Sequence, residues 1–249
     1  MCTEIEKSKV WHGWIDVPPG KAGTGEGAWL DLSHPLTADL SRSPAFPQPV
    51  FSRLLSMPEG SANITMISMV CHHGTHLDAP SHVIVRGPTI DTIPLDRLYG
   101  EAVVWKIEPP PGGALTAQQF EDATPSAQRG DIVVLDTGTA QHMNTPAYEE
   151  HPWLSVEAAQ WLVDHGVKMV CVDFTSPDLP LHRRPPGFAW PAHHVLLGHG
   201  VLIVEHVKPP PFLAGKRVEF SVNALNLVGS DGAPARPMAR PVRETRVPS

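Results

Sequence analysis

The fold is decided by the run Gly130-Asp131-Ile132-Val133-Val134-Leu135-Asp136 and by the residues that follow it. This run is almost continuously apolar, which is typical of a strand covered on both faces. Ser155 begins a predicted helix that extends to His165, and Gly166 supplies the stop. Residues 168–173 then read as the next buried strand. The alternation of strand, helix and strand predicts an α/β domain with at least one parallel crossover.

Other elements are expected on both sides of this unit. An apolar run at 64–70 is extended, and Thr116 caps a helix over 116–123. The segment around Pro44, Pro47 and Pro49 cannot form regular structure and is a candidate pocket wall. Further strands are predicted at 28–33, 100–107, 201–204 and 217–227.

Composition limits the domain organisation. With 249 residues, of which 41% are hydrophobic, the chain is long enough for one substantial core. We therefore expect one domain over residues 28–249. Residues 1–27 mix charged residues, glycines and prolines and are expected to form a loosely ordered arm. Trp11 and Trp14 indicate that this arm docks on a surface, with a partner subunit as one candidate.

Charge and cysteine content exclude several classes of protein. The formal charge of −7 and the pI near 6.0 argue against a nucleic-acid partner, because no basic stripe with interleaved aromatics is present. Three cysteines are too few for a disulfide scaffold, and no secretory signal pattern opens the sequence. No apolar run is long enough to cross a bilayer. These features predict a cytoplasmic protein that acts on a small molecule.

Functional groups are densest in Cys71-His72-His73-Gly74-Thr75-His76-Leu77-Asp78-Ala79-Pro80-Ser81-His82. If this segment is extended, side chains two residues apart share a face. The shared face then carries His72, His76, Asp78 and His82, while Gly74 leaves room there for an ion or a substrate. Burying so many polar groups together costs free energy unless they share a partner, and a single metal ion could bind them all.

Imidazole and carboxylate ligands suit zinc, manganese or ferrous iron, and three protein ligands with an open position are typical of hydrolytic metal sites. His82 lies past Pro80 and is either a fourth ligand or a proton carrier; spacing does not separate these roles. His73 alternates to the opposite face and is expected to be structural or to support a ligand. Cys71 and Cys171 are expected to be structural, because free cysteines usually bury as small apolar residues.

A second cluster combines Pro191-Ala192-His193-His194 with Glu205, at the end of the strand predicted at 201–204. Strand ends are where α/β folds gather reactive groups. One interpretation is that His193 and Glu205 converge on the first cluster. The alternative is that Glu205 is an exposed residue at the end of a strand and has no role in a site.

Several motifs together resemble the cyclase family, which includes bacterial kynurenine formamidases and isatin hydrolases. They occur in the family's order and span about four fifths of the chain. They are Asp31-Leu32-Ser33-His34-Pro35-Leu36, His-x-Gly-Thr-His-x-Asp-x-Pro-x-His at 72–82, Gly-Asp-Ile-Val at 130–133, Asp173-x-x-Ser176-x-Asp178, His193 twelve residues before Glu205, and Asp231-Gly232-Ala233-Pro234-Ala235-Arg236.

The resemblance implies a swivelling β/β/α-type domain with a mixed sheet and flanking helices, assembled as a homodimer or homotetramer. It implies one or two divalent ions, zinc or manganese. His72, His76 and Asp78 would bind the first ion, Asp78 would bridge to a second, and His193 with Glu205 would hold that second ion. His82 matches the family's proton-transfer histidine. We expect supporting roles for His73, Thr75, Ser176 and Asp178.

Two departures bear on the substrate. Kynurenine formamidases carry a tryptophan before a proline where this chain has Ser43-Pro44. The loop 179–190 of this chain is longer than the corresponding loop of those enzymes, and in this respect the chain resembles the isatin hydrolases of the family. Aromatic contacts would then come from Phe46, Phe51, Phe188 or Trp190.

The resulting hypothesis is hydrolysis of an amide, cyclic amide or lactone bond of a small aromatic substrate by metal-activated water. One alternative is a non-hydrolytic cyclase or lyase that uses the metal as a Lewis acid. The other is a protein that binds a metal or ligand without turnover.

Overall fold

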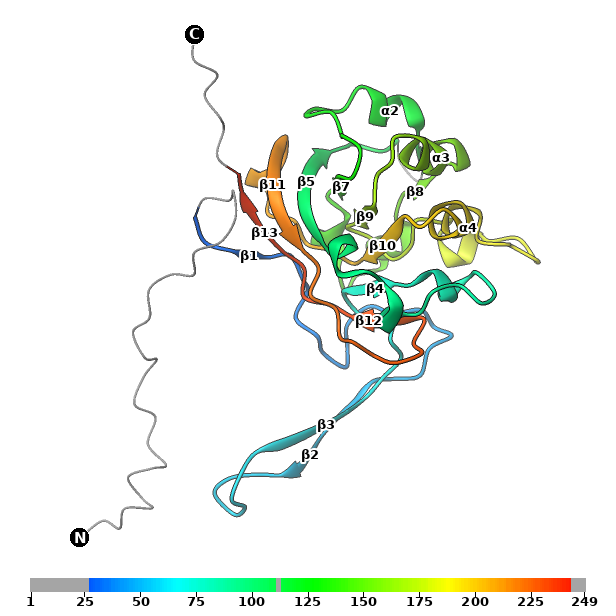
Figure 1. Cartoon of the computed structure of the whole chain (residues 1–249). Helices are drawn as coiled ribbons and strands as arrows, with labels where there is room; N and C mark the ends of the chain where they lie inside the picture. Colours follow the sequence, from blue (N-terminus) through cyan, green and yellow to red (C-terminus); the bar gives the residue numbers. More distant parts are fainter. Residues whose placement is uncertain (1–26, 111–112, 243–249) are drawn as a thin grey trace.

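A nine-stranded mixed sheet is the main element of the computed structural model, which describes residues 27–110 and 113–242 (Figure 1). The strands follow the order β1-β13-β11-β5-β7-β9-β10-β4-β12. Their bounds are Leu30–Asp31 (β1), His76–Asp78 (β4), Tyr99–Lys106 (β5), Ile132–Asp136 (β7), Met169–Val172 (β9), Leu202–Glu205 (β10), Lys216–Ser221 (β11), Gly232–Pro234 (β12) and Met238–Pro241 (β13). The central strands β5, β7, β9 and β10 are parallel, and the flanking strands run antiparallel to their neighbours.

The predicted crossover is confirmed. Strand β7 is followed by helix α3 (Val156–Asp164) and then by β9, which pairs with β7 in parallel. The Ser155 hydroxyl caps α3 by accepting from the Ala158 amide, and Gly166 ends the unit with a φ of +67°. Helix α2 (Ala117–Glu121) begins at Thr116 with a capping box formed with Gln119. The chain is thus a mixed α/β domain, as predicted.

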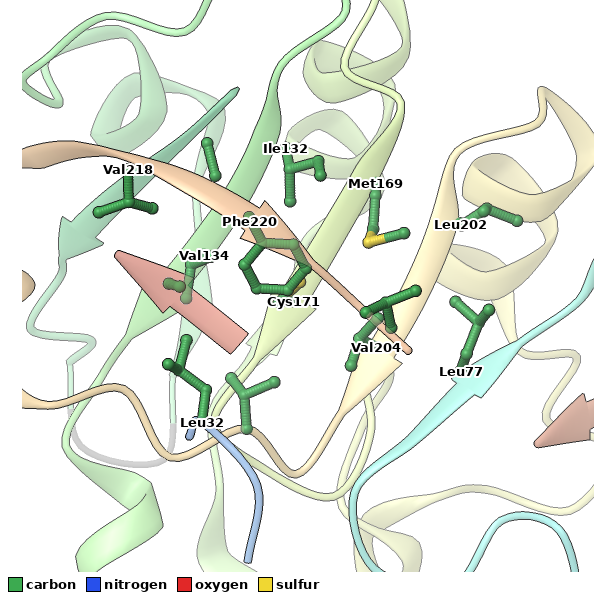
Figure 2. Packing of buried hydrophobic residues seen from close by; sticks show 14 of the residues in the cluster. Leu32, Leu77, Ile132, Val134, Met169, Cys171, Leu202, Val204, Val218 and Phe220 are labelled. Atoms are coloured by element: carbon green, nitrogen blue, oxygen red, sulfur yellow. The ribbon is translucent and has the colours of Figure 1, made fainter. Parts of the chain in front are cut away.

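Side chains from the two faces of the sheet form two cores, because consecutive strand residues point to opposite sides. Val133 and Val170 belong to the core under the helices α2, α3 and α4 (Pro191–Gly198). Val134 and Cys171 belong to the other core, where the sheet curls so that Phe220 of β11 packs over them (Figure 2). Cys171 is completely buried, as predicted for a small core residue.

The hairpin of β2 (Val50–Leu55) and β3 (Ile64–Ser68) projects away from the body of the domain (Figure 1). All five residues of β3 are exposed, so the apolar run at 64–70 does not enter the core. β3 also ends at Ser68, before the histidines.

A short parallel pair, β6 (Ala114–Leu115) with β8 (Trp153–Leu154), and 3₁₀ helices complete the described chain. The 3₁₀ helices are Pro80–His82 (η1), Ile90–Thr92 (η2), Leu95–Arg97 (η3), Thr139–His142 (η4), Pro146–Glu150 (η5), Leu181–Arg183 (η6) and Pro211–Leu213 (η7).

Three parts of the secondary structure differ from the sequence prediction. The strand predicted over 217–227 ends at Ser221, and the tail from Gly232 contains the unpredicted strands β12 and β13. Helix α4 was also not predicted.

In the described part of the chain no helix is long and apolar enough to cross a membrane. The predicted N-terminal arm lies outside the described residues, apart from Gly27.

Candidate metal centre

His76 and Asp78 lie on β4, two residues apart, and therefore point to the same side of the sheet. Strand β10 pairs antiparallel with β4 and places Glu205 directly opposite His76. Opposite residues of an antiparallel pair share a face, so Glu205 joins the same cluster. His76 Nε2 lies 3.2 Å from Asp78 Oδ1 and 3.5 Å from Glu205 Oε2. Sheet pairing thus brings one member of the second sequence cluster to the first.

The histidine segment is not a single extended strand, contrary to the prediction. Residues 71–75 turn, and Gly74 adopts a φ of +67°. A Cβ at Gly74 would lie 2.9 Å from the side chains of Leu36 and Leu40, so this glycine permits the turn and its packing. It does not provide space for an ion.

His72 reaches the cluster from the turn rather than by strand alternation. Its Nδ1 lies 2.8 Å from Asp78 Oδ1, and its Nε2 lies 2.9 Å from Asp231 Oδ2. Gly232 makes this position accessible, because a Cβ there would lie only 2.6 Å from the His72 ring. Burial alone would lower the pKa of His72, but the carboxylates of Asp78 and Asp231 raise it to about 9.

His193 comes from the first turn of α4. Its Nε2 lies 3.4 Å from Glu205 Oε1 and 3.6 Å from Asp78 Oδ2. Asp178 accepts hydrogen bonds from the Ala192 and His193 amides, so it caps the helix, and its Oδ2 lies 2.6 Å from His193 Nδ1. One carboxylate therefore fixes both the helix start and the direction of the imidazole.

A cation fits this donor set. His76 Nδ1 lies 2.8 Å from the Gly74 carbonyl, which makes Nδ1 the donor and leaves Nε2 as the free nitrogen. His76 Nε2 and Asp78 Oδ2 are buried and make no hydrogen bond to any described residue. Buried polar atoms normally have a hydrogen-bond or metal partner, so these two unpaired atoms indicate a bound ion. Imidazole nitrogen and carboxylate oxygen are ligands that suit zinc or manganese.

The electrostatics of Asp78 agree with a cation site. Burial alone would raise the pKa of Asp78, but the imidazoles of His76, His193 and His72 hold it well below its ordinary value. The buried carboxylate is therefore anionic, and its free oxygen is directed into the cluster.

His82 lies in η1, beside the cluster. Its ring centroid is 4.1 Å from that of His72 and 5.6 Å from that of His193, and its Nδ1 lies 3.3 Å from Asp231 Oδ2. Burial lowers the pKa of His82. Asp231 thus contacts both His72 and His82. Sequence reasoning did not assign it a role, although it opens the last block of the family resemblance.

The remaining polar residues that were expected to support the site are Thr75, Ser176 and His73, and Ser176 also lines a cavity over the cluster. Thr75 Oγ1 accepts from the His34 amide and donates to the His206 carbonyl, and Ser176 Oγ accepts from the Asp178 amide. These hydroxyls hold backbone segments and do not contact the clustered side chains. His73 is buried, with Nε2 2.9 Å from the Thr37 carbonyl. Cys71 is half-buried, and its Sγ lies 3.3 Å from Ser230 Oγ.

A cavity of about 190 Å³ opens over the cluster. Phe46 and Trp190, two of the residues expected to supply aromatic contacts to a substrate, line it together with His72, His82, His193 and Glu205. Phe188 is not a lining residue but packs against Arg184, and Phe51 lies on β2 of the projecting hairpin. The titratable lining residues that the sequence did not single out are Glu149, His151, Arg184 and His206.

Trp190 has an unusual backbone at this position. It precedes α4 in a left-handed conformation, with a φ of +53°, which is uncommon outside glycine. Its ring lies edge-on to His193, with centroids 5.1 Å apart. Strained backbone of this kind persists where the surroundings over-determine it, often at functional sites.

Comparison with known proteins agrees with this geometry. The family model described as "Putative cyclase" matches residues 30–179, more than half of the chain. A kynurenine formamidase of Bacillus cytotoxicus is 30% identical over 219 residues, which cover 86% of this chain and 98% of that protein. A solved structure described as a "Potential Metal-Dependent Hydrolase With Cyclase Activity" is 25% identical, with a TM-score of 0.72 and coverage of 87% of this chain and 99% of that chain.

Isatin hydrolase A from Labrenzia aggregata has the same fold, with a TM-score of 0.75 at 20% identity over 87% of this chain and 94% of that chain. The family model covers β4 with His76 and Asp78, whereas His193 on α4 and Glu205 on β10 lie beyond the residues that it matches. On these grounds the chain belongs to the cyclase family.

Proposed function

We propose that this chain is a metal-dependent hydrolase that cleaves an acyl carbon–nitrogen bond in a small aromatic amide, either a formamide or a cyclic amide, or the corresponding bond of a lactone. The observation that carries the proposal is the pair of buried, unpartnered ligand atoms, His76 Nε2 and Asp78 Oδ2, beneath an aromatic-walled cavity. The family membership, and the names of the formamidase and isatin hydrolase relatives, support the same class of reaction.

The ligand set would be His72, His76, Asp78, His193 and Glu205, holding one or two zinc or manganese ions. When bound, a divalent ion polarises the substrate carbonyl and lowers the pKa of water to about 7. The protein orients two of these donors beforehand: the Gly74 carbonyl fixes His76, and Asp178 fixes His193. Such outer partners set the tautomer and direction of a ligating imidazole.

His82 would transfer the proton. Its Nδ1 lies beside Asp231, so Nε2 is the nitrogen left to accept a proton from water and return it to the leaving nitrogen or oxygen. The short distance between the His82 and His72 rings keeps this group next to the metal ligands.

The cavity limits the size of the substrate. A cavity of about 150 Å³ holds one benzene ring, and the space here is about 190 Å³. It therefore suits one substituted aromatic ring placed between Phe46 and Trp190. Aromatic side chains favour such a ring through offset or edge-on packing.

The test begins with elemental analysis of gently purified protein, followed by a screen of aryl formamides, isatin-like cyclic amides and small lactones. Turnover that chelation abolishes and metal restores supports the proposal. Reaction in ¹⁸O-labelled water distinguishes the alternatives: label in the product means hydrolysis, whereas unlabelled product means a cyclase or lyase. Bound metal without turnover of any compound favours a binding protein. A homodimer or homotetramer, and a cytoplasmic location, stay predictions.

A further inference from the structure

Arg184 lines the cavity in a fixed position. Its Nε donates to the Leu179 carbonyl at 2.7 Å, and its Nη2 donates to Ser176 Oγ at 3.2 Å. The guanidinium also lies over the Trp190 ring, 4.0 Å from its centroid, and 5.4 Å from the Phe188 centroid. Two hydrogen bonds and two ring contacts therefore hold this side chain in one orientation.

The charge of Arg184 has no paired carboxylate among the described residues. No acidic oxygen of residues 27–110 or 113–242 forms an ion pair with it. The acidic groups that act on its pKa are Asp178 and Glu205, and both already contact His193. Arg184 Nη1 likewise donates to no described residue.

A half-buried guanidinium without a counter-ion has unsatisfied donors. Arg184 is half-buried, so its charge is partly removed from water, and this burial lowers the pKa of the guanidinium. Arginine presents its N–H groups as a planar fork that matches a carboxylate in a two-pronged hydrogen bond. In a cavity sized for one aromatic ring, the carboxylate that completes such a pair would be carried by the ligand.

We propose that Arg184 binds a carboxylate on the substrate, so that the site prefers aryl amides that carry a negative charge over neutral ones. This inference rests on the proposed function and adds a substrate class to it. Trp190 serves both partners, because its ring packs against the guanidinium and lines the space for the substrate ring. The alternative is that Arg184 only fastens the loop 179–190 to Ser176.

Kinetics with matched substrates separate the two roles. The metal-loaded full chain is assayed with formanilide and with its ortho-, meta- and para-carboxy derivatives. We expect kcat/KM for at least one carboxylated isomer to exceed that for formanilide about tenfold to hundredfold, mainly through KM, as charge-assisted hydrogen bonds allow. This preference, taken as a ratio, falls close to one in Arg184→Gln and takes an intermediate value in Arg184→Lys.

Arg183→Gln is the matched control. This neighbour carries the same charge but stacks on Trp153 and does not line the cavity, so its loss leaves the preference unchanged. A wild-type enzyme that prefers no carboxylated isomer overturns the inference. So does an Arg184→Gln variant in which activity on all four compounds falls alike, because that result identifies a purely structural role.

Failure of the proposed function gives a different result, namely no turnover of any of the four compounds. In that case the binding of a carboxylate ligand tests the role of Arg184. Isothermal titration calorimetry with benzoate should show binding to the wild type and to Arg183→Gln, and at least tenfold weaker binding to Arg184→Gln. Benzyl alcohol, which lacks the charge, should not distinguish the variants. Benzoate that binds all three proteins alike, or none of them, overturns the inference.

Discussion

Asp178 Oδ2 lies 2.6 Å from His193 Nδ1 and also accepts the backbone amide of the same residue. Burial alone would raise the pKa of Asp178, but the His193 ring and two helix amides lower it. An anionic Asp178 keeps the proton of His193 on Nδ1, so that Nε2 faces Asp78 and Glu205. A residue without direct contact to the ion would therefore govern how tightly the ion is held.

Replacement of Asp178 with asparagine tests this role. We expect metal affinity, measured by competition with a chromophoric chelator, to fall about 10- to 100-fold, because an amide holds the imidazole less firmly in the required tautomer. Asp164→Asn is the control, since that exposed carboxylate only accepts from Gln160. Equal affinities in the two variants would remove Asp178 from the account.

Gly232→Ala should disturb His72. The new Cβ would lie 2.6 Å from the ring, and His72 is held between Asp78 and Asp231, so it cannot move without losing one of these bonds. We expect kcat/KM to fall about 100-fold, as for a small misplacement of a reacting group. The exposed Gly198 is the control, because a Cβ there makes only an ordinary contact of 3.5 Å. Full activity in Gly232→Ala would show that His72 is free to shift.

His82→Ala separates proton transfer from metal binding. If His82 carries the proton, the variant keeps its metal while kcat falls by about 10²- to 10⁴-fold, the usual contribution of a general acid–base group. Metal content by elemental analysis and turnover are measured on the same sample. Loss of the ion would instead make His82 a ligand.

Asp173 should make the fold less stable as the pH rises. Burial, aided by Asp136, raises the pKa of Asp173 to about 6 against the bonds from Thr137. Because this folded-state pKa lies above the unfolded value, the stabilising contribution is complete at pH values below the unfolded pKa. It is lost as the pH rises through 6. Asp173→Asn removes this dependence.

Urea unfolding of both proteins at pH 5 and pH 7.5 measures the effect. We expect the free energy of unfolding of the wild type to fall by about 1 kcal/mol more than that of Asp173→Asn over this interval. Parallel pH dependence of the two proteins would mean that Asp173 is ionised throughout the range.

The parts of the fold that the sequence predicts are those with strong local signals. The runs at 130–136 and 168–173 are apolar throughout, and Ser155 and Gly166 mark the ends of the helix between them. The missed elements depend on distant partners. Helix α4 is capped by Asp178 rather than by a local side chain, and β12 exists because β4 offers it a pairing edge.

The residues of the site likewise divide into those with a local sequence signal and those whose position depends on distant parts of the chain. His76 and Asp78 are adjacent on a strand, so their shared face could be predicted from spacing. Glu205 joins them only through the antiparallel pairing of β10 with β4, and His72 only through the turn at Gly74. Arg184 gave no signal in the sequence, because its significance depends on the absence of an ion-pair partner in the described structure.

Metal content of the wild type and of Asp78→Asn tests the central claim most directly. Asp78 contacts His72, His76 and His193 and offers the unpartnered buried oxygen of the cluster. After exposure to zinc or manganese and removal of free ion, we predict one or two ions per wild-type chain. We predict none in Asp78→Asn, with hydrolysis lost as well. A wild-type chain that retains no divalent ion, or an Asp78→Asn chain that retains ion and activity in full, would contradict the account.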